Sequence, residues 1–237
     1  MYRVLGALAR PLGFLLTYLY RFIQNYGITL LVFTFIVKVL LYPLYAKQIK
    51  SSVRMAELQP KMKELQRKYA NDKQAMNQKM MEMYKTEKFN PMSGCLPALL
   101  QMPIIFGLFA LLRSPTMFID GEEMLIATHE SFLWIMNLSQ PDPWILPILA
   151  GITTFISFSQ TQAQNKGMAD ANPTMTQVMK MMKYVFPVMI MVMGRTFPAG
   201  LTIYWFFGQF VQILFNIHLG NVKKKLRAES ERKSRNK

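Results

Sequence analysis

Long apolar stretches alternate with polar, charged segments along the whole chain. The apolar stretches are residues 28–46, 94–112, 143–161, 182–196 and 199–219. A transmembrane helix needs about 20 mainly apolar residues, and only the fourth stretch is clearly shorter. The pattern therefore predicts an all-α membrane protein with five transmembrane helices. The last two are expected to be joined by a tight turn, because Pro198 and Gly200 break the helix there.

The charges lie in the connections between these stretches, and their signs predict an orientation. Segment 47–93 has 11 Lys and Arg against 5 acids, and segment 220–237 has 8 against 2. Segment 162–181 is also more basic than acidic, whereas segment 113–142 has five acids and no Lys or Arg after Arg113. Cytoplasmic loops carry the excess of Lys and Arg. We therefore expect 113–142 outside the cell and the other three segments, with the C-terminus, in the cytoplasm.

Residues 1–27 form a separate amphipathic pattern. Arg3, Arg10 and Arg21 fall on one helical face, and Leu, Phe and Tyr cover the rest. This pattern is typical of a helix that lies in the membrane interface, here on the extracytoplasmic side. The alternative is an ordinary membrane anchor or a sixth span, with Gly27 as the hinge into the first core span. A cleaved signal peptide is not expected, because Arg10 interrupts the apolar run and no small-residue cleavage site follows.

Segment 47–93 is expected to form a cytoplasmic helical hairpin. Its helices should run from Ser51 to Tyr69 and from Lys73 to Thr86, with the turn at Asn71-Asp72. Apolar residues recur at spacings of three and four in both helices, which is typical of a packed helix pair. They are Met55, Leu58, Met62, Leu65 and Tyr69 in the first helix, and Met76, Met80, Met83 and Tyr84 in the second. Lys and Arg on the outer faces indicate lipid headgroups or another anionic surface as partner.

Polar residues form stripes inside the predicted spans. Lys38 is the single full charge within the first span, and no Asp or Glu occurs in any of the five. In the first span Thr34, Tyr42 and Tyr45 share a helical face with Lys38, and the second span has one polar side chain, Gln101. In the third span the polar stripe is Thr153, Ser157, Gln160, Thr161 and Gln164. In the fifth span it is Thr202, Trp205, Gln209, Gln212 and Asn216. Such groups should face other helices or water rather than lipid. One interpretation is hydrogen bonding between helices; the other is a water-holding groove with Lys38 as its fixed positive charge.

The remaining chemistry argues against an enzyme, a metal centre or a cofactor. The chain has one cysteine, Cys95, and two distant histidines, His129 and His218. No nucleophile–base set, zinc motif or phosphate-binding glycine loop is present in the sequence. Charged residues make up only 17% of the chain, yet the net charge is +15. An ordinary soluble domain and a wholly disordered basic chain both fail to fit that combination.

The basic tail and the methionines each allow two interpretations. Residues 220–237 are expected to be disordered when alone. In one interpretation this tail fixes the topology and contacts lipid; in the other it docks on ribosomal RNA. The 20 methionines suit either gap filling between helices or a surface that accepts varied apolar partners.

Several ordered runs resemble the YidC-type membrane protein insertases (the YidC/Oxa/Alb family). They are NYGITLLVFTFIVKVLLYPLYAKQIKSSVRMAELQPKMKELQRKY, NPMSGCLPALLQMPIIFGLFALL, FLWIMNLSQPDP and FPAGLTIYWFFGQFVQILFN. Together they extend over nearly all of residues 25–219. The absence of a large extracytoplasmic domain resembles the short form found in Gram-positive-type bacteria.

The resemblance implies insertion and folding of newly made membrane proteins, alone or beside the Sec translocon, without ATP hydrolysis. It also implies a hydrophilic groove that is open to cytoplasm and lipid and carries one positive residue, usually Arg. Lys38 stands at that position, with the charge but without the planar guanidinium. The implied partners are nascent membrane proteins, membrane lipids and, through the basic tail, the ribosome. The implied location is the bacterial cell membrane.

Two other classes of protein stay open at this point. A small-solute transporter or channel could line its pathway with the same stripes, although internal repeats and intramembrane acids are missing from the sequence. A non-transporting membrane scaffold could use the basic hairpin and tail to bind partners.

Overall fold

The structure is a computed structural model that describes residues 2–90, 96–113, 117, 122–164 and 173–235. Within these residues all long elements are α-helices, and a single β-bridge joins Phe132 and Ile135. The helices are α1 (Tyr2–Ile23), α2 (Tyr26–Lys68), α3 (Lys73–Thr86), α4 (Leu96–Arg113), α5 (Glu122–Ala127), α6 (Ile145–Gln164), α8 (Pro173–Gly194) and α9 (Ala199–Arg235). The predicted all-α class is confirmed.

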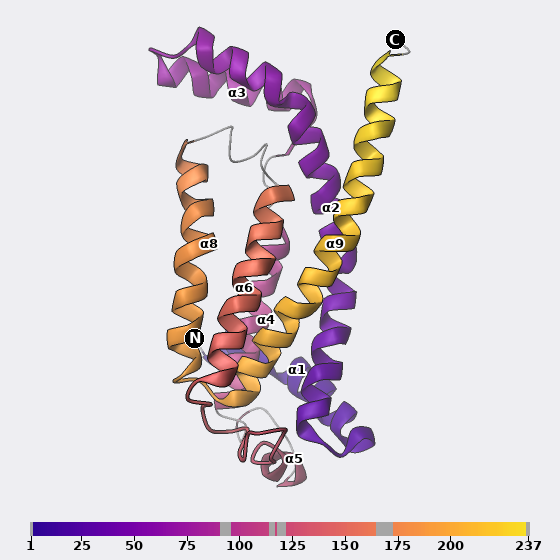
Figure 1. The fold of residues 1–237 in the computed structure, drawn as a ribbon, viewed down its shortest axis with the longest axis vertical. Helices are drawn as coiled ribbons and strands as arrows, with labels where there is room; N and C mark the ends of the chain where they lie inside the picture. Colours follow the sequence, from indigo (N-terminus) through magenta and orange to yellow (C-terminus); the bar gives the residue numbers. More distant parts are fainter. Residues whose placement is uncertain (1, 91–95, 114–116, 118–121, 165–172, 236–237) are drawn as a thin grey trace.

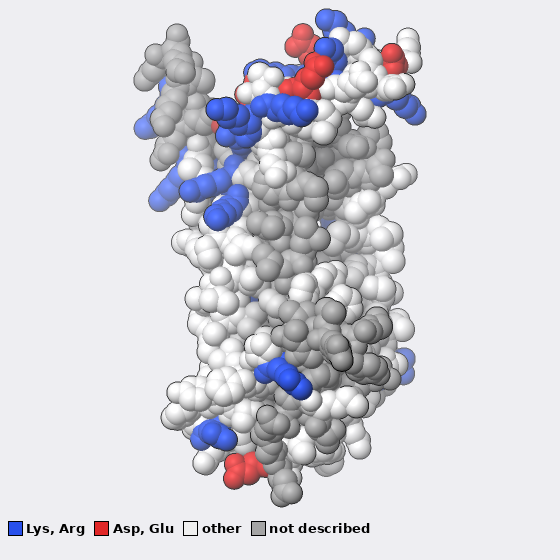
Figure 2. All heavy atoms as spheres, turned by 180° about the vertical axis from the view of Figure 1, so that it is seen from behind, with Lys and Arg blue, Asp and Glu red and all other residues white. Residues whose placement is uncertain are grey.

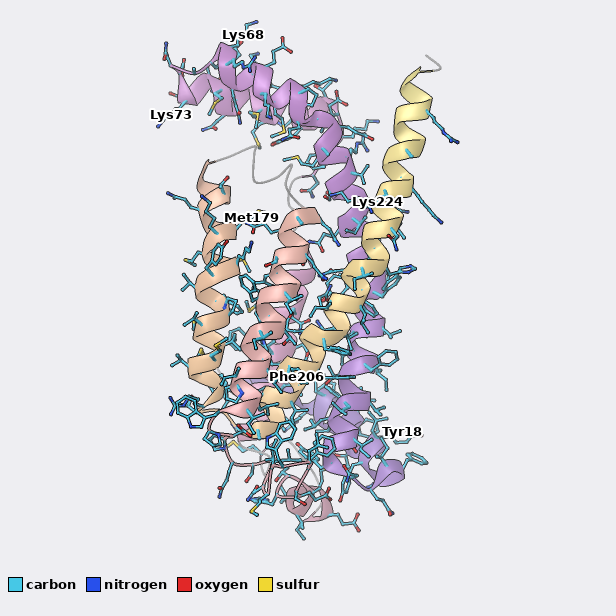
Figure 3. The ribbon with its side chains drawn as sticks, in the orientation of Figure 1. Tyr18, Lys68, Lys73, Met179, Phe206 and Lys224 are labelled. Atoms are coloured by element: carbon cyan, nitrogen blue, oxygen red, sulfur yellow. The ribbon has the colours of Figure 1, made fainter. Side chains whose placement is uncertain are left out.

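α8, α6, α9 and α2 stand side by side, and α9 lies between α6 and α2 (Figure 1). α9 packs along α6 on one side and along α2 on the other, while α8 packs on α6 and α4 packs mainly on α1. α1 crosses the lower part of the bundle at an angle, beside the connection that contains α5 (Figure 1). At the other end, α2 turns over into α3, with Lys68 and Lys73 flanking the turn at the hairpin tip (Figure 3). We call these two ends of the molecule the α5 end and the hairpin end.

The surface of the bundle separates charged ends from an apolar middle. Lys and Arg gather at the hairpin end and on the far part of α9, and the middle carries few charges (Figure 2). Large apolar side chains on that middle zone are exposed, among them Phe35, Leu40, Ile152, Val188 and Leu214. By length and composition, two described segments could cross a membrane, 26–68 and 199–226, and 101–112 is a shorter apolar helix.

The helices extend beyond the predicted spans at the hairpin end. The span predicted at 28–46 and the hairpin helix predicted at 51–69 are one continuous helix, α2. Likewise α6 reaches Gln164, α8 begins at Pro173, and α9 continues to Arg235 through the tail that was expected to be disordered. Apolar runs mark only the lipid-facing part of a helix. An existing helix grows into Lys-, Arg- and Glu-rich sequence without a new nucleation cost.

The hairpin has a small apolar core of its own. Met55, Leu58, Met62 and Phe89 are buried together, with Met80, Met83 and Tyr84 packed against them. α3 has the bounds expected from the sequence, and Asp72 caps it by accepting hydrogen bonds from the backbone N–H groups of Gln74 and Ala75. An ion pair between Lys61 and Glu87, at 2.5 Å, links the two helices at the surface. Leu65, Tyr69 and Met76, which the spacing predicted to lie between the two hairpin helices, are only half-buried.

The joint between α1 and α2 lies at Gln24 and Asn25. Gln24 has a positive φ of 52°, and the Asn25 side chain accepts a hydrogen bond from the Ile28 N–H to cap α2. Gly27, the hinge in the alternative interpretation, is instead inside α2. A Cβ atom there would lie 2.2 Å from the ring of Phe132, so Gly27 allows close contact with the connection that follows α5. The change of direction between α1 and α2 therefore takes place at Gln24, one of the rare non-glycine residues that adopt this conformation.

Candidate functional site

Lys38 lies in the interior of the bundle, where α2 faces α9. Its side chain is 5% exposed. Its Nζ lies 3.4 Å from Oε1 of Gln212 and 5.8 Å from the centre of the Tyr45 ring. Among the described residues no carboxylate pairs with this amine. A buried cation with only a neutral acceptor is costly, so an anionic partner would stabilise it.

Amide side chains continue from Lys38 toward α6. Nε2 of Gln212 donates to Oδ1 of Asn216 at 3.1 Å. Nδ2 of Asn216 in turn donates to the Ser157 carbonyl at 3.3 Å and to the Thr161 hydroxyl at 3.2 Å. Gln212 and Asn216 are four residues apart, and so are Ser157 and Thr161, so each pair shares one face of its helix. The contacts therefore join α2, α9 and α6 in one chain of hydrogen bonds.

The same three helices are tied together again at the hairpin end. Nε2 of Gln164 donates to the Asn216 carbonyl at 2.7 Å. The Gln164 carbonyl, at the C-terminus of α6, accepts from the Ser52 hydroxyl at 2.6 Å and from the Lys223 amine. Lys223 also donates to the Ser52 hydroxyl at 2.9 Å. A cation at a helix C-terminus is favourable because the last carbonyls carry partial negative charge.

We call this set of side chains the polar seam. Its members are Lys38, Ser52, Ser157, Thr161, Gln164, Gln212, Asn216 and Lys223. The three Lys223–Ser52–Gln164 contacts form its clasp. The seam has a cation at each end, and no carboxylate of the described residues takes part in it.

Gly208 makes room for the lysine. A Cβ atom at this position of α9 would lie 3.3 Å from Cε of Lys38 and 3.6 Å from the methyl of Thr34. Any larger side chain would therefore press on the stem of Lys38. Gly208 lies one turn before Gln212 on α9. The aliphatic part of Lys38 therefore passes α9 at Gly208, and its amine reaches the side-chain amide of Gln212.

Several predicted site residues lie outside the seam. Gln101 donates to the Tyr204 hydroxyl at 3.0 Å, and Trp205 donates to the Thr154 hydroxyl at 2.9 Å. The hydroxyls of Thr34 and Thr153 donate to carbonyls of their own helices, and that of Thr202 donates to the Pro198 carbonyl just before α9. Tyr42 and Tyr45 both pack edge-on against Phe215. Gln160 has a buried Oε1 with no hydrogen-bond partner among the described residues, and Gln209 is half-buried.

Five residues in these contacts are not predicted by the sequence pattern: Ser52, Thr154, Tyr204, Gly208 and Lys223. Lys223 is the first of three consecutive lysines, and nothing in the sequence distinguishes it from the next two. Ser52 belongs to a helix that was expected to lie in the hairpin, so it was not paired with a span. For Thr154 a signal did exist, because it follows Thr153 in a span that already contained a polar stripe.

In this conformation the seam is closed. Ser157 is 1% exposed, and Asn216 and Gln212 are also buried. The polar groups thus act as hydrogen-bond partners between helices, which is what the first interpretation of the stripes required. A ligand could reach the Lys38 amine only if the helices around it moved apart.

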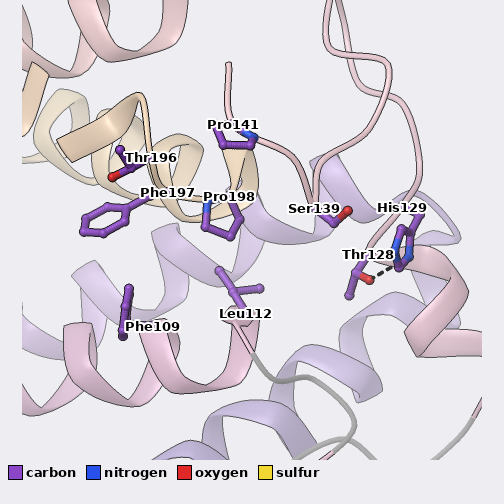
Figure 4. Close-up of a pocket in the computed structure, with 9 residues that line it drawn as sticks. All are labelled: Phe109, Leu112, Thr128, His129, Ser139, Pro141, Thr196, Phe197 and Pro198. Atoms are coloured by element: carbon purple, nitrogen blue, oxygen red, sulfur yellow. Dashed lines mark hydrogen bonds between the residues drawn. The ribbon is translucent and has the colours of Figure 1, made fainter. Parts of the chain in front are cut away.

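A separate open cavity of about 520 Å³ lies at the α5 end, beside the turn between α8 and α9 (Figure 4). It is lined by Phe109, Leu112, Thr128, His129, Ser139, Pro141, Thr196, Phe197 and Pro198. His129 contacts the Thr128 hydroxyl through Nδ1 at 3.2 Å. No cluster of three or more metal-ligand side chains occurs in the part of the chain that the structure describes.

The comparison with known proteins places the chain in a family. The family model described as "60Kd inner membrane protein" matches residues 18–226. A Fusobacterium nucleatum protein named "Membrane protein insertase YidC" is 39% identical over 212 residues, which are 89% of this chain and 94% of that protein. A relative of the same name from Oceanobacillus iheyensis is 42% identical over 197 residues, 81% of this chain and 73% of the relative.

Other matches are longer than this chain. A relative of that name from Geobacter sp. is 41% identical over 203 residues, 84% of this chain but 34% of the relative. The solved structure "Active YidC insertase crystal structure with the first transmembrane domain resolved" has a TM-score of 0.57 at 23% identity. That match covers 88% of this chain and 45% of the other, so it supports the fold. The match over residues 18–226 and the two relatives that this chain covers for most of their length show that it belongs to the 60Kd inner membrane protein family, the YidC-type family expected from the sequence.

Proposed function

We propose that the chain is a bacterial membrane protein insertase that helps hydrated segments of new membrane proteins to cross the bilayer. The observation that carries the proposal is Lys38, a buried amine in the apolar zone with no carboxylate partner among the described residues. A Lys at the centre of a membrane helix costs about 2.5–3.5 kcal/mol on insertion scales. A protein keeps such a charge where it meets an anion, and an acidic residue of a passenger would provide one.

The membrane topology is part of this proposal. α2, α4, α6, α8 and α9 each cross the bilayer, with the hairpin end in the cytoplasm and α1 in the outer interface. The basic hairpin end, the apolar middle and the exposed aromatic and aliphatic side chains support this arrangement. Glu130 supports the placement of α1, because it accepts hydrogen bonds from the Tyr20 hydroxyl and from the Tyr26 backbone N–H and so ties α1 to the outer connection.

The mechanism is a reduction of the desolvation barrier. A passenger approaches the seam from the cytoplasm, the clasp opens, and α2 and α6 part over α9. The acidic group of the passenger then pairs with Lys38, and Gln, Ser and Thr side chains replace part of the lost water. The apolar segment leaves sideways into lipid, where burial of its surface drives the reaction. No covalent bond changes, and neither ATP nor a cofactor takes part.

The basic charge of the hairpin end indicates which partners the protein would bind. The hairpin and the C-terminal part of α9 carry most of the Lys and Arg, which suits anionic lipid headgroups and the phosphates of a ribosome. A translocon of the Sec type is a further partner in this proposal, beside which the chain would receive longer passengers.

The test is insertion of single-span clients into proteoliposomes that contain the purified chain. Two clients differ only in a short translocated tail, which carries Asp and Glu in one and Asn and Gln in the other. We expect the chain to favour the acidic tail, Lys38→Arg to retain that preference, and Lys38→Gln to remove it. An unchanged preference in Lys38→Gln would refute the role of the charge.

A further inference from the structure

We propose that Gln212 positions the Lys38 amine and leaves its charge available, and that this neutral amide thereby sets the preference for acidic passenger segments. The inference rests on the proposed function. It assigns specificity to a residue of α9 that contacts the amine without forming an ion pair with it.

The orientation of the Gln212 amide is fixed by its surroundings. Its Nε2 donates to Asn216, so its Oε1 faces Lys38. A flipped amide would point two N–H donors at an ammonium group, which has donors only, and would lose both bonds. Only one of the two orientations therefore satisfies both neighbours.

The orientation of the Gln212 amide depends on Asn216, whose own amide is held by α6. Its own amide donates to the Ser157 carbonyl and to the Thr161 hydroxyl, and a carbonyl and a hydroxyl can both accept. This leaves the Asn216 Oδ1 to accept from Gln212. The position of the amine on α2 is thus set by α6, through two amides of α9.

The amine keeps most of its capacity for a ligand. An ammonium group has three donors, and among the described residues it has one hydrogen-bond acceptor, the Gln212 oxygen at 3.4 Å. That acceptor carries no net charge, so it holds the amine in place without cancelling the field of the cation. Gly208 contributes by leaving space for the lysine stem, since a Cβ there would lie 3.3 Å from Cε.

A purely structural role for Gln212 makes a different prediction. If the amide served only as a hydrogen-bond partner between α2 and α9, a carboxylate at its place would accept from Lys38 at least as well, because charge-assisted bonds are stronger. If the neutral charge of the amide matters, the same carboxylate would pair with the amine and remove the attraction for acidic passengers. Gln212→Glu separates the two roles.

The experiment compares Gln212→Glu with wild type in the two-client insertion assay. We expect the ratio of acidic-tail to neutral-tail insertion to fall about tenfold, which corresponds to the loss of one charge-assisted interaction. Gln212→Met, which keeps the size but is only a weak acceptor, should lower the rate with the acidic tail while a preference for it remains. Gln177→Glu, on the exposed face of α8, changes the net charge equally and should leave the ratio unchanged. Thermal unfolding in detergent checks that each variant is folded.

The outcomes distinguish this inference from the proposed function. If Lys38→Gln removes the preference and Gln212→Glu keeps it, the insertase mechanism stands and the inference on Gln212 is wrong. If Lys38→Gln itself has no effect on the ratio, the charge mechanism fails. A fall in the ratio for Gln177→Glu as large as for Gln212→Glu would also overturn the inference, because the effect would then follow the net charge alone.

Discussion

Loss of the clasp should open the polar seam, and Lys223→Met is the most direct perturbation. The substitution keeps an unbranched side chain of similar length but removes the amine that contacts the Ser52 hydroxyl at 2.9 Å and the carbonyl of Gln164. Hydrogen bonds with a charged donor contribute about 1.5–3 kcal/mol in buried sites. Lys223 is half-exposed, so we take about 2 kcal/mol for both contacts together. The open form should become about 30-fold more populated.

The assay is thiol labelling at Ser157→Cys, in a chain whose natural cysteine is replaced by Cys95→Ser. The Ser157 side chain is 1% exposed, and its carbonyl rather than its hydroxyl accepts from Asn216, so the cysteine should fit without loss of a seam contact. A water-soluble maleimide reacts only with the open form, and its rate therefore reports the open population. We expect the rate to rise by about 30-fold in Lys223→Met. Ser52→Ala should give a smaller rise, because the contact of Lys223 with Gln164 remains.

The matched control is Lys224→Met, on the exposed neighbour in the same part of α9 (Figure 3). It removes the same charge and should leave the labelling rate unchanged. Equal rates in wild type, Lys223→Met and Lys224→Met would refute the reasoning, since the clasp would then hold nothing closed. An equal rise in both variants would assign the effect to net charge rather than to the clasp.

Three further predictions concern the fold. Gly27→Ala should lower the melting temperature by several degrees, because the new Cβ lies 2.2 Å from the Phe132 ring, and Phe132→Ala should recover part of that loss in the double variant. Met62→Ala should destabilise the hairpin by about 2–4 kcal/mol, which hydrogen exchange would report as faster exchange confined to residues 50–90. The Lys61 ammonium holds the pKa of Glu87 below its usual 4.5, so the pair should stabilise the hairpin above about pH 4.5 and lose this effect as the pH falls through the lowered pKa. Hairpin exchange, corrected for the intrinsic pH dependence, should therefore differ between wild type and Glu87→Gln at pH 7 and converge at low pH.

Each of these three predictions has a control. Gly220→Ala should not lower the melting temperature and should raise it slightly, since a Cβ there would have no neighbour closer than 3.7 Å and Ala favours a helix more than Gly does. Met81→Ala, at an exposed position of α3, should leave hairpin exchange unchanged. A hairpin that exchanges equally fast in Met62→Ala and Met81→Ala would contradict the assigned core. A constant difference between wild type and Glu87→Gln from pH 7 to pH 3 would contradict the role of the ion pair.

The helices and six of the eight seam residues could be predicted, because both depend mainly on short-range periodicity. Gln212 and Asn216 lie four residues apart, as do Ser157 and Thr161, so the sequence alone puts each pair on one helical face. Lys38 was recognisable because a charge inside an apolar run is rare.

The rest depends on contacts between residues far apart in the chain. Nothing near Ser52 indicates that it meets α6, and the pairing of Gly27 with Phe132 joins segments about 100 residues apart. The helix ends were misjudged for another reason. Hydropathy reports where a helix leaves lipid, whereas α2 ends at Lys68, where the local backbone stops being helical. A helix and its membrane-embedded part are therefore separate predictions.

The unbroken course of α2 has a mechanical consequence. This helix carries Lys38 in its first third and the first arm of the hairpin at its far end, over 43 residues, or about 65 Å. A force applied to the hairpin would therefore act, through one continuous helix, on the segment that holds the amine. Pro43 and Pro60 lack the backbone N–H group, so each removes one hydrogen bond of α2 and marks a point at which this helix can bend.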